Sequence, residues 1–401
     1  MDATLTASHI LPADGAAGTL VGRVWRPDID GPSVVVVRKD GSVEDVTRAA
    51  PTVAGLMNEP DPVALLRGAA GERLGTVDEI LANSAAATAP HGARDHGRPW
   101  FLAPIDLQAV KAAGVTFASS LLERVVEEQA RGEASRAQEV RQALVAEIGT
   151  DLSAVKPGSE DAARLKTALE RRGLWSQYLE VGIGPDAEIF TKCQPMASVG
   201  VGAEIGLHPG STWNNPEPEI VLVVDSRGRI QGAALGNDVN LRDVEGRSAL
   251  LLGRAKDNTG SSAIGPFVRL FDETFDIEDV RQAEVDLRVD GPDQFVLTGR
   301  SSMRMISRDP ADLVAQAIGA TNQYPDGLVL YLGTMFAPTE DRDAPGEGFT
   351  HKQGDIVTIS TPRLGALINR VGTSDRIPRW EFGAMALMRN LARRGLLPSA
   401  S

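Results

Sequence analysis

The sequence predicts an α+β protein in which a region of small strands and long helices precedes a mixed, largely antiparallel β region. Apolar residues recur at helical spacing between residues 105 and 172. From residue 174 to about residue 371 they alternate instead, with frequent Gly and Pro between them. Strands and helices do not alternate regularly along this second region, which argues against a doubly wound parallel sheet.

The first region, residues 1–185, is expected to begin with small strands and to continue with helices. The 401 residues, 42% of them apolar, are enough for two domains or for one core with a large extension. Residues 86–99, rich in Ala, His, Gly and Pro, predict an irregular connection. Strands are predicted at Leu20–Trp25 and Ser33–Val37, and helices at 63–83, 105–111, 119–148 and 159–172.

The second region, residues 186–401, is expected to form the larger β domain and to end in a basic amphipathic helix around residues 389–394. Two further helices are predicted within it, at 241–252 and 310–318. The predicted strands are Glu188–Thr191, Ser198–Val201, Glu219–Val224, Ile230–Leu235, Glu284–Val289, Gln294–Arg300, Leu328–Leu332 and Asp355–Ser360.

Composition excludes several classes of function. The formal net charge is -13 and the basic residues are scattered, which argues against nucleic-acid binding and against a patch for anionic membranes. Cys193 is the only cysteine, so an intrachain disulfide, an iron-sulfur cluster and a thiolate zinc site are excluded. The first residues lack a signal-peptide pattern and no apolar run is long enough to span a bilayer, so we expect a cytoplasmic protein.

Three carboxylates, those of Glu217, Glu219 and Asp238, indicate a cation site. Alternate residues of a strand share a face, so Glu217 and Glu219 point the same way. A hairpin turning at residues 226 and 227 puts residue 219 opposite about 234 and residue 217 opposite about 236, with Asp238 just past Glu217. The three carboxylates are therefore expected to meet at one end of this hairpin.

Carboxylates without a nearby His or Cys favour a hard cation, namely Mg²⁺, with Mn²⁺ or Ca²⁺ as alternatives, over zinc. The competing interpretation is that Glu217 and Glu219 are solvated strand ends and that Asp238 caps the following helix. The spacing alone leaves both interpretations open.

An ordered set of motifs resembles the fumarylacetoacetate hydrolase family. It comprises the Glu-Pro-Glu pair, the Asp-Val-Asn-Leu-Arg-Asp string of 238–243, a lysine at 256 and the Gly-Pro at 265 and 266. Further matches are Phe190-Thr191-Lys192, Pro195, Ser198-Val199-Gly200, Gly333-Thr334, Gly354-Asp355 and Leu364-Gly365. The resemblance covers about residues 186–371 and implies a mixed β-roll or barrel of the fumarylacetoacetate hydrolase type.

The resemblance also implies a function for the carboxylates. It makes Glu217, Glu219 and Asp238 ligands of Mg²⁺ or Ca²⁺, with a 2-oxo acid or 1,3-dicarbonyl bound to the cation, which polarises the ketone and stabilises the enolate. By the same resemblance Lys256 is catalytic, whereas Lys192 and Thr334 bind substrate. The family also implies a homodimer or a larger homo-oligomer.

The segment that forms a lid in this family departs from the family pattern. Carbon–carbon hydrolases of the family carry a histidine and a glutamate there that activate water. The corresponding string, Gly-Val-Thr-Phe-Ala-Ser-Ser-Leu-Leu-Glu at 114–123, places Ser120 at the histidine and retains Glu123. Because serine has no proton affinity in the useful range, hydrolysis of a carbon–carbon bond is disfavoured.

The Ser-Ser lid, the long N-terminal region and the Pro-Glu-Pro-Glu motif resemble the 2-keto-3-deoxy-sugar-acid dehydratase branch. This resemblance implies Mg²⁺-dependent dehydration of a 2-keto-3-deoxypentonate to 2,5-dioxopentanoate. Glu123 and Lys256 are then the candidate acid and base, and Ser119 and Ser120 the candidates for binding substrate hydroxyls.

Two other functions remain open from the sequence. One is cleavage or decarboxylation of a 2-oxo or 1,3-dicarbonyl acid with water activated by Glu123 alone, and the other is a non-catalytic assembly protein. Among the five histidines, His351 is the one that could belong to the site through a mobile loop. The sequence does not settle whether it does.

Overall fold

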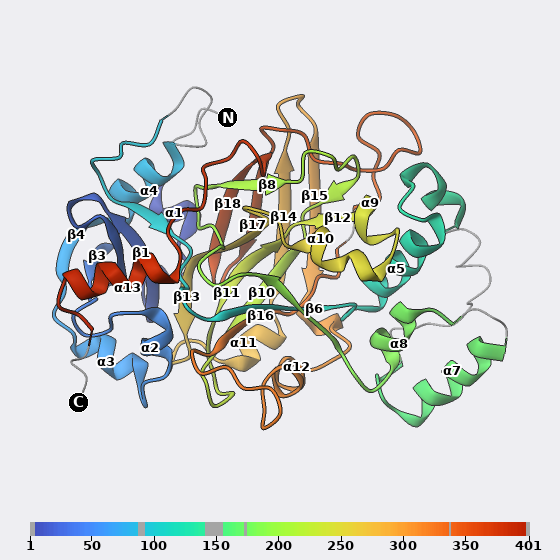
Figure 1. The fold of residues 1–401 in the computed structure, drawn as a ribbon, viewed down its shortest axis with the longest axis horizontal. Helices are drawn as coiled ribbons and strands as arrows, with labels where there is room; N and C mark the ends of the chain where they lie inside the picture. Colours follow the sequence, from blue (N-terminus) through green and yellow to red (C-terminus); the bar gives the residue numbers. More distant parts are fainter. Residues whose placement is uncertain (1–4, 87–92, 141–154, 172–174, 337, 398–401) are drawn as a thin grey trace.

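The structure is a computed structural model that describes residues 5–86, 93–140, 155–171, 175–336 and 338–397. Its main feature is a mixed sheet of eleven strands (Figure 1). The strand order is β4 (Glu72–Thr76), β3 (Ser42–Asp45), β2 (Gly31–Val37), β1 (Leu20–Arg26), β13 (Ser262–Leu270), β11 (Ile230–Asp238), β10 (Pro218–Val224), β16 (Leu328–Tyr331), β6 (Ala109–Gly114) and β7 (Glu188–Cys193), with β5 (Trp100–Leu102) paired to β1.

A second sheet of five strands packs against the first. Its order is β15 (Val296–Ser302), β14 (Glu284–Asp290), β17 (Ile356–Thr361), β18 (Gly365–Thr373) and β8 (Glu204–Leu207). Most pairs are antiparallel, whereas β16–β6 and β18–β8 are parallel. The prediction of a mixed, largely antiparallel α+β protein is confirmed.

The main core lies between the two sheets. Ile220 and Leu222 of β10 belong to the same buried cluster as Leu287 of β14 and Ile359 of β17. The alternate residues Val221 and Val223 belong to a second cluster on the other face of the large sheet. This explains why residues 220–224 read as one continuous apolar run, since both faces of β10 are buried.

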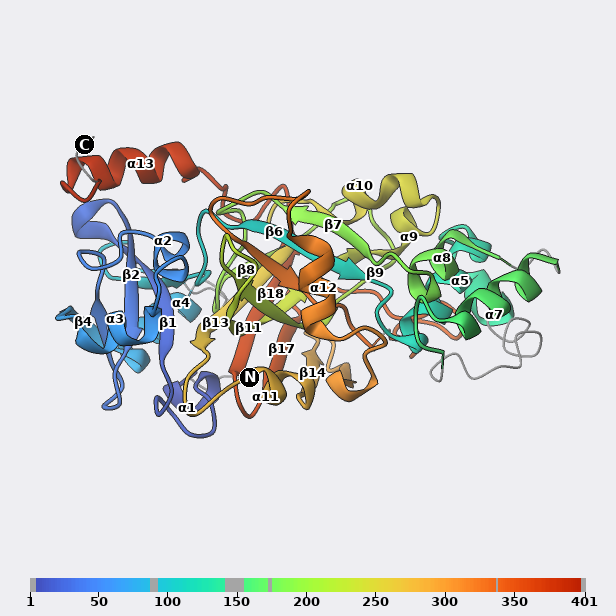
Figure 2. The same cartoon turned by 90° about the horizontal axis from the view of Figure 1, so that it is seen from below.

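Helices cover the sheets and extend the molecule at both ends (Figures 1 and 2). The N-terminal strands β1–β4 lie at one end with α13 beside them, and α5, α7 and α8 lie at the other. The α-helices are α1 (Ala7–Ile10), α2 (Val53–Met57), α3 (Pro62–Gly68), α4 (Val77–Ala86), α5 (Ala118–Ala130), α7 (Glu160–Arg171), α8 (Gln177–Ile183), α9 (Arg242–Glu245), α10 (Leu252–Lys256), α11 (Ile277–Arg281), α12 (Pro310–Ala317) and α13 (Ala384–Arg393). None of the described helices is long and apolar enough to cross a bilayer.

Four predicted elements were wrong. The helix expected at 105–111 is instead strand β6, because pairing with β16 and β7 outweighs local helical spacing. Residues 198–201 form only a single bridge, between Val199 and Ala263. The helix expected at 241–252 is divided into α9, a 3₁₀ turn and α10. The helix expected at 119–148 is interrupted after Ala130, where the next two residues have positive φ, and helix resumes at residues 134–140, whereas residues 141–154 lie outside the described part.

The large sheet joins the two regions of the sequence. Strand β1 of the N-terminal region pairs with β13, and β6 fills the place between β16 and β7. Strands from before and after residue 185 are thus hydrogen-bonded within one sheet. The division into 1–185 and 186–401 stays a prediction based on composition.

A buried ion pair holds the long connection between β16 and β17. Arg342 donates to both oxygens of Asp355 at 2.7 Å, and both side chains are fully buried. Arg342 also donates to Asp293 at 2.9 Å. Because the connection contains little regular structure, this pair is its main polar anchor.

We expect Arg342→Leu to destabilise the protein by about 3 kcal/mol, because Asp355 would remain buried with part of its charge uncompensated. Chemical denaturation of the two proteins measures this difference. Arg300→Leu is the control, since Arg300 forms an exposed ion pair with Asp286 and its loss is expected to leave stability unchanged. Equal stabilities of wild type and Arg342→Leu would contradict the assignment.

Candidate active site

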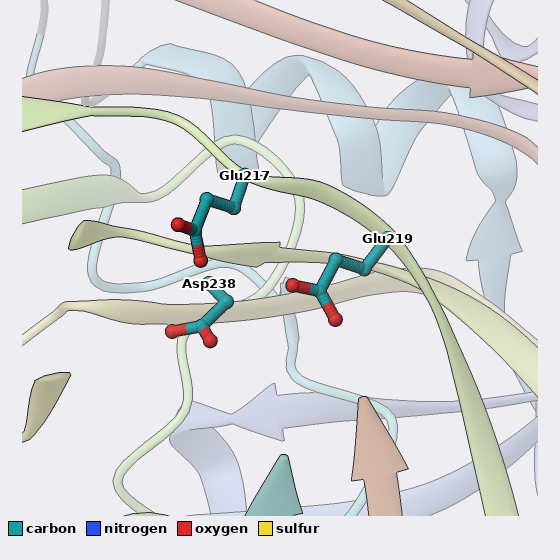
Figure 3. A group of neighbouring side chains, drawn as sticks. All are labelled: Glu217, Glu219 and Asp238. Atoms are coloured by element: carbon teal, nitrogen blue, oxygen red, sulfur yellow. The ribbon is translucent and has the colours of Figure 1, made fainter. Parts of the chain in front are cut away.

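The three carboxylates meet at one end of the β10–β11 hairpin. Glu219 lies opposite Gly236 in the ladder, and the amide of Asp238 donates to the carbonyl of Glu217 at 3.1 Å. Oxygens of all three side chains lie within 4.8 Å of one another and point toward a common centre (Figure 3). The prediction that they converge is confirmed.

The predicted register of this hairpin was wrong by two residues. Residue 219 was expected opposite about 234, but it lies opposite Gly236. The difference arises because the turn spans residues 225–229 and the ladder shifts between Val223 and Val224. As a result, Asp238 lies directly opposite Glu217 rather than just past it.

The three carboxylates are buried, so the interpretation as solvated strand ends is wrong. At most 3% of each residue is exposed. Burial raises the pKa of Glu219 well above its usual value, and the charges of Asp238 and Glu217 raise it further. For Asp238, burial alone would raise the pKa, but Lys192 and Lys256 outweigh it and lower the pKa. We call this group of three carboxylates the acidic centre.

Two lysines compensate the charge of the acidic centre. Lys256 Nζ donates to Glu217 and, at 3.1 Å, to Asp238 Oδ2. Lys192 Nζ lies 2.8 Å from Asp238 Oδ1 and donates to the carbonyl of Val239 at 3.0 Å. Burial alone would lower the pKa of Lys256, but the neighbouring carboxylates, Asp238 foremost, raise it above its usual value. The carboxylates of the acidic centre therefore set the proton affinity of Lys256.

The predicted lid segment contacts the acidic centre through Arg124, which the sequence analysis did not single out. Arg124 on α5 pairs with Glu217 and with Glu245, the latter at 3.0 Å. The remaining predicted lid residues have other partners: Ser119 donates to the carbonyl of Met335, Ser120 to that of Phe117, and Glu123 pairs with Arg242 at 3.2 Å. The catalytic and binding roles of these three residues stay predictions.

A buried network of charges fixes α5 over the site. Glu127 accepts from Arg124 at 2.6 Å and from Arg242 Nε at 2.7 Å. The guanidinium of Arg242 also lies 4.2 Å from the ring centroid of Trp213 and donates to the carbonyl of Pro338. Helix α5 is thus tied to α9 and to the connection after β16.

Glu188 on β7 is a candidate that the sequence analysis missed. Burial raises its pKa, and the charges that act on it include those of Arg124, Lys256 and Glu217. Gly114 lies opposite Glu188 in the ladder, and a Cβ at Gly114 would collide with the Glu188 carboxylate. The available signal was period two, because Glu188, Phe190 and Lys192 alternate along β7 and Lys192 reaches Asp238.

Thr334 and His351 lie near the centre without entering it. Thr334 follows Gly333, whose amide donates to Glu219 Oε2 at 2.7 Å, and its own hydroxyl accepts from Phe336. His351 is buried against Asp355 at 3.0 Å, and its backbone amide donates to Asn214 at 3.1 Å. His351 thus supports the polar strand beside the centre, whereas substrate binding by Thr334 and Lys192 stays a prediction.

Comparison with known proteins identifies the segment that holds the acidic centre. Residues 180–372 match the family described as fumarylacetoacetate (FAA) hydrolase C-terminal. This segment is an FAA hydrolase C-terminal domain. The resemblance expected from the ordered motifs is confirmed, and the three carboxylates, Lys256 and Glu188 all lie within the FAA hydrolase domain.

Two curated relatives are similar to part of the chain. A 2-dehydro-3-deoxy-D-arabinonate dehydratase of Saccharolobus solfataricus is 32% identical over 46% of this chain and 58% of its own length. A protein of Haloferax volcanii named "Probable 2-keto-3-deoxyxylonate dehydratase" is 29% identical over 51% of this chain and 66% of its own length. The matches thus span less than two thirds of each relative's own length.

Solved structures share the fold beyond the FAA hydrolase domain. One, a 2-keto-3-deoxy-D-arabinonate dehydratase complexed with magnesium and 2,5-dioxopentanoate, has a TM-score of 0.60 at 20% identity and covers 88% of this chain and 99% of its own. Its apo form covers 90% and 100% with the same TM-score. The expected fumarylacetoacetate hydrolase-type fold is confirmed.

The acidic centre of the FAA hydrolase domain fits a divalent cation. It offers only carboxylate oxygens, the donors that hard cations prefer. The raised pKa of Glu219 reflects burial and repulsion that a cation would relieve. Glu217, Glu219 and Asp238 are thus the residues that would hold it.

We expect Mg²⁺ to raise the melting temperature of the wild type, because a ligand at one hundred times its Kd adds about 2.7 kcal/mol of stability. Glu219→Gln is expected to abolish this shift. Asp225→Asn is the control, since Asp225 is a buried carboxylate at the opposite end of the same hairpin and its variant should keep the shift. A full Mg²⁺ shift in Glu219→Gln would contradict the site.

His351 is expected to make stability depend on pH. Burial lowers its pKa in the folded state, despite the adjacent Asp355, while Arg342 lowers it further. Below about pH 6.5 the unfolded chain therefore takes up a proton that the folded protein does not, and stability falls. Thermal melts of wild type and His351→Gln should show a smaller advantage for the wild type at pH 5.5 than at pH 8. A difference independent of pH would contradict this.

Proposed function

We propose that the protein is a Mg²⁺-dependent hydro-lyase that converts a 2-keto-3-deoxypentonate into 2,5-dioxopentanoate and water. The observation that carries the proposal is the buried acidic centre with Lys256 beside it. Glu188 lies two alternations before Lys192 on β7, and Lys192 reaches Asp238. The names of the two curated relatives support the same reaction class. The substrate would be an anionic 2-oxo acid.

Glu217, Glu219 and Asp238 would hold the Mg²⁺, and Mn²⁺ or Ca²⁺ would suit the same donors. When bound, the cation supplies Lewis acidity toward the carboxylate and ketone oxygens of a 2-oxo acid. Lys192 would orient Asp238. It pairs with the Asp238 carboxylate and donates to the carbonyls of Val239 and Lys256. This lysine therefore fixes the position of the ligand oxygen.

Lys256 and Glu188 are proposed to handle the two protons of the dehydration. One takes the proton from C3, and the other gives a proton to the hydroxyl that leaves C4 as water. The raised pKa of Glu188 keeps its carboxyl protonated at higher pH than usual, which suits an acid. Loss of a C5 proton with protonation of C3 then gives the enol of C4 and C5, and transfer of the enol proton from oxygen to C4 completes the aldehyde.

The lid supports elimination over hydrolysis. Helix α5 carries Ser120 where hydrolases of the family have a histidine, and its hydroxyl is engaged by the carbonyl of Phe117. His351 is bonded to Asp355, and none of the described histidines donates to the acidic centre. Among the described residues, no histidine is therefore a candidate for activating water. The homo-oligomeric and cytoplasmic expectations stay predictions.

Incubation of the purified protein with Mg²⁺ and 2-keto-3-deoxypentonate tests the proposal. We expect 2,5-dioxopentanoate to accumulate and EDTA to stop the reaction. Formation of pyruvate or another fragment would instead establish carbon–carbon cleavage. No reaction with any 2-oxo acid, together with unaltered Mg²⁺ binding in Glu217→Gln, would favour the assembly role.

Glu188→Gln is expected to lower kcat by about a hundredfold or more while KM and Mg²⁺ affinity change little, because the amide cannot exchange a proton. Glu123→Gln is the comparison, since Glu123 is the other carboxylate proposed as an acid and is paired with Arg242. Steady-state kinetics on both variants decide between them. A full kcat in Glu188→Gln with a lost kcat in Glu123→Gln would reverse the assignment.

A further inference from the structure

A short ladder of asparagines continues the strands that carry the acidic centre. Asn240 lies opposite Asn215 where β12 (Asn240–Leu241) pairs with β9 (Asn214–Asn215). The preceding rungs are Asp238 opposite Glu217 and Gly236 opposite Glu219. Because alternate residues of extended chain share a face, Asn215 and Asn240 follow Glu217 and Asp238 on the same face, roughly 7 Å further along.

Three of the four side-chain amide atoms of this rung lack partners among the described residues although they are buried, whereas Nδ2 of Asn215 donates to the carbonyl of Pro216 at 2.9 Å. Asn240 is fully buried and Asn215 is 2% exposed. Neither Oδ1 nor Nδ2 of Asn240, nor Oδ1 of Asn215, has a hydrogen bond to any of the residues that the structure describes. Buried side-chain amides normally are bonded, because an unsatisfied one costs free energy on folding.

Other buried asparagines are bonded through at least one amide atom, although Nδ2 of Asn237 also has no partner among the described residues. Asn214 accepts from the His351 amide and donates to Ser211, and Asn237 accepts from the Glu217 amide. Asn390, equally buried, donates to the carbonyls of Ile29 and Asp30. Asn215 and Asn240 are therefore available to a ligand that lies beside the acidic centre.

The chemistry of the rung selects hydroxyl groups. An amide oxygen accepts and an amide nitrogen donates, which matches a neutral hydroxyl that does both. A second cation would be repelled by the Nδ2 donors of Asn240, and a second carboxylate by Oδ1 of both residues. A ligand fits both the acidic centre and the asparagine rung if it has an acid group at one end and hydroxyls along its chain.

We propose that Asn215 and Asn240 form the subsite for the hydroxyl-bearing end of the substrate and so select polyhydroxylated over plain 2-oxo acids. This inference rests on the proposed function, because it assumes that a 2-oxo acid binds at the acidic centre. The amides act on specificity and not on proton transfer. The unpaired amides destabilise the folded protein, and hydrogen bonds from the substrate hydroxyls would offset this destabilisation.

The test compares 2-keto-3-deoxypentonate with pyruvate, which lacks hydroxyls, in wild type and Asn240→Leu, both with saturating Mg²⁺. The variant should lower kcat/KM for the pentonate about tenfold, mainly through KM, with pyruvate inhibition and Mg²⁺ affinity unchanged within about twofold. Its melting temperature should equal or exceed that of the wild type, since a buried unpaired amide is removed.

Asn390→Leu is the matched control. It should lose stability, because bonded amides are removed, and should keep the preference for the pentonate. Asn240→Ser is the second variant, so that misfolding of Asn240→Leu does not prevent the measurement. An unchanged ratio between pentonate and pyruvate in a folded Asn240 variant would overturn the inference and leave the rung as a site for water.

The two proposals fail differently. If no dehydration occurs, calorimetry with the same two acids still measures the preference, and its dependence on Asn240 would sustain the subsite. Dehydration with a preference that ignores Asn240 would sustain the reaction and overturn the subsite alone. Equal affinity of the wild type for both acids would overturn the subsite in either case.

Discussion

The compensation of buried charge at the acidic centre is the constraint on which the rest of the structure depends. Three carboxylates cannot share one small buried volume unless positive charge lies beside them. The protein supplies it from three separate elements, through Lys192 on β7, Lys256 at the end of α10 and Arg124 on α5. Each of these elements must therefore be placed within hydrogen-bond distance of one hairpin end, which fixes the relative positions of the sheet and the lid.

The compensation is unequal among the three carboxylates. Lys256 donates hydrogen bonds to Glu217 and Asp238. Glu219 instead accepts a hydrogen bond from the backbone amide of Gly333, and its pKa is raised. Such an arrangement of carboxylates would gain from binding a cation. The proposed subsite follows the same logic, because the amide of Asn240 and Oδ1 of Asn215 would be satisfied by a ligand. Polar groups that lack partners within the protein would thus contribute to the affinity for a ligand.

Sequence patterns predicted the acidic centre because its residues are local. Glu217, Glu219 and Asp238 lie on one hairpin, and period two with a turn signal places them together. The same reasoning failed where contacts are distant: β6 looks helical until its pairing with β16, more than two hundred residues away, is known. Arg124 was missed for this reason, since nothing near it in sequence indicates that it pairs with Glu217 and Glu245. Turn length, which set the register error, depends on the side chain of Asp225 bonding to the amides of Arg227 and Arg229.

The position of β6 between β16 and β7 has a consequence for modularity. The FAA hydrolase domain spans residues 180–372, yet its two strands β16 and β7 never touch, because a strand from residues 109–114 separates them. Excised alone, the domain would leave strand edges unpaired at β16, β7 and β13, and it would lose the helix that supplies Arg124. The family unit seen in the sequence is therefore not a unit of folding here. The N-terminal region cannot be exchanged freely during evolution, since each replacement would have to provide both a matching strand and the charge of the lid.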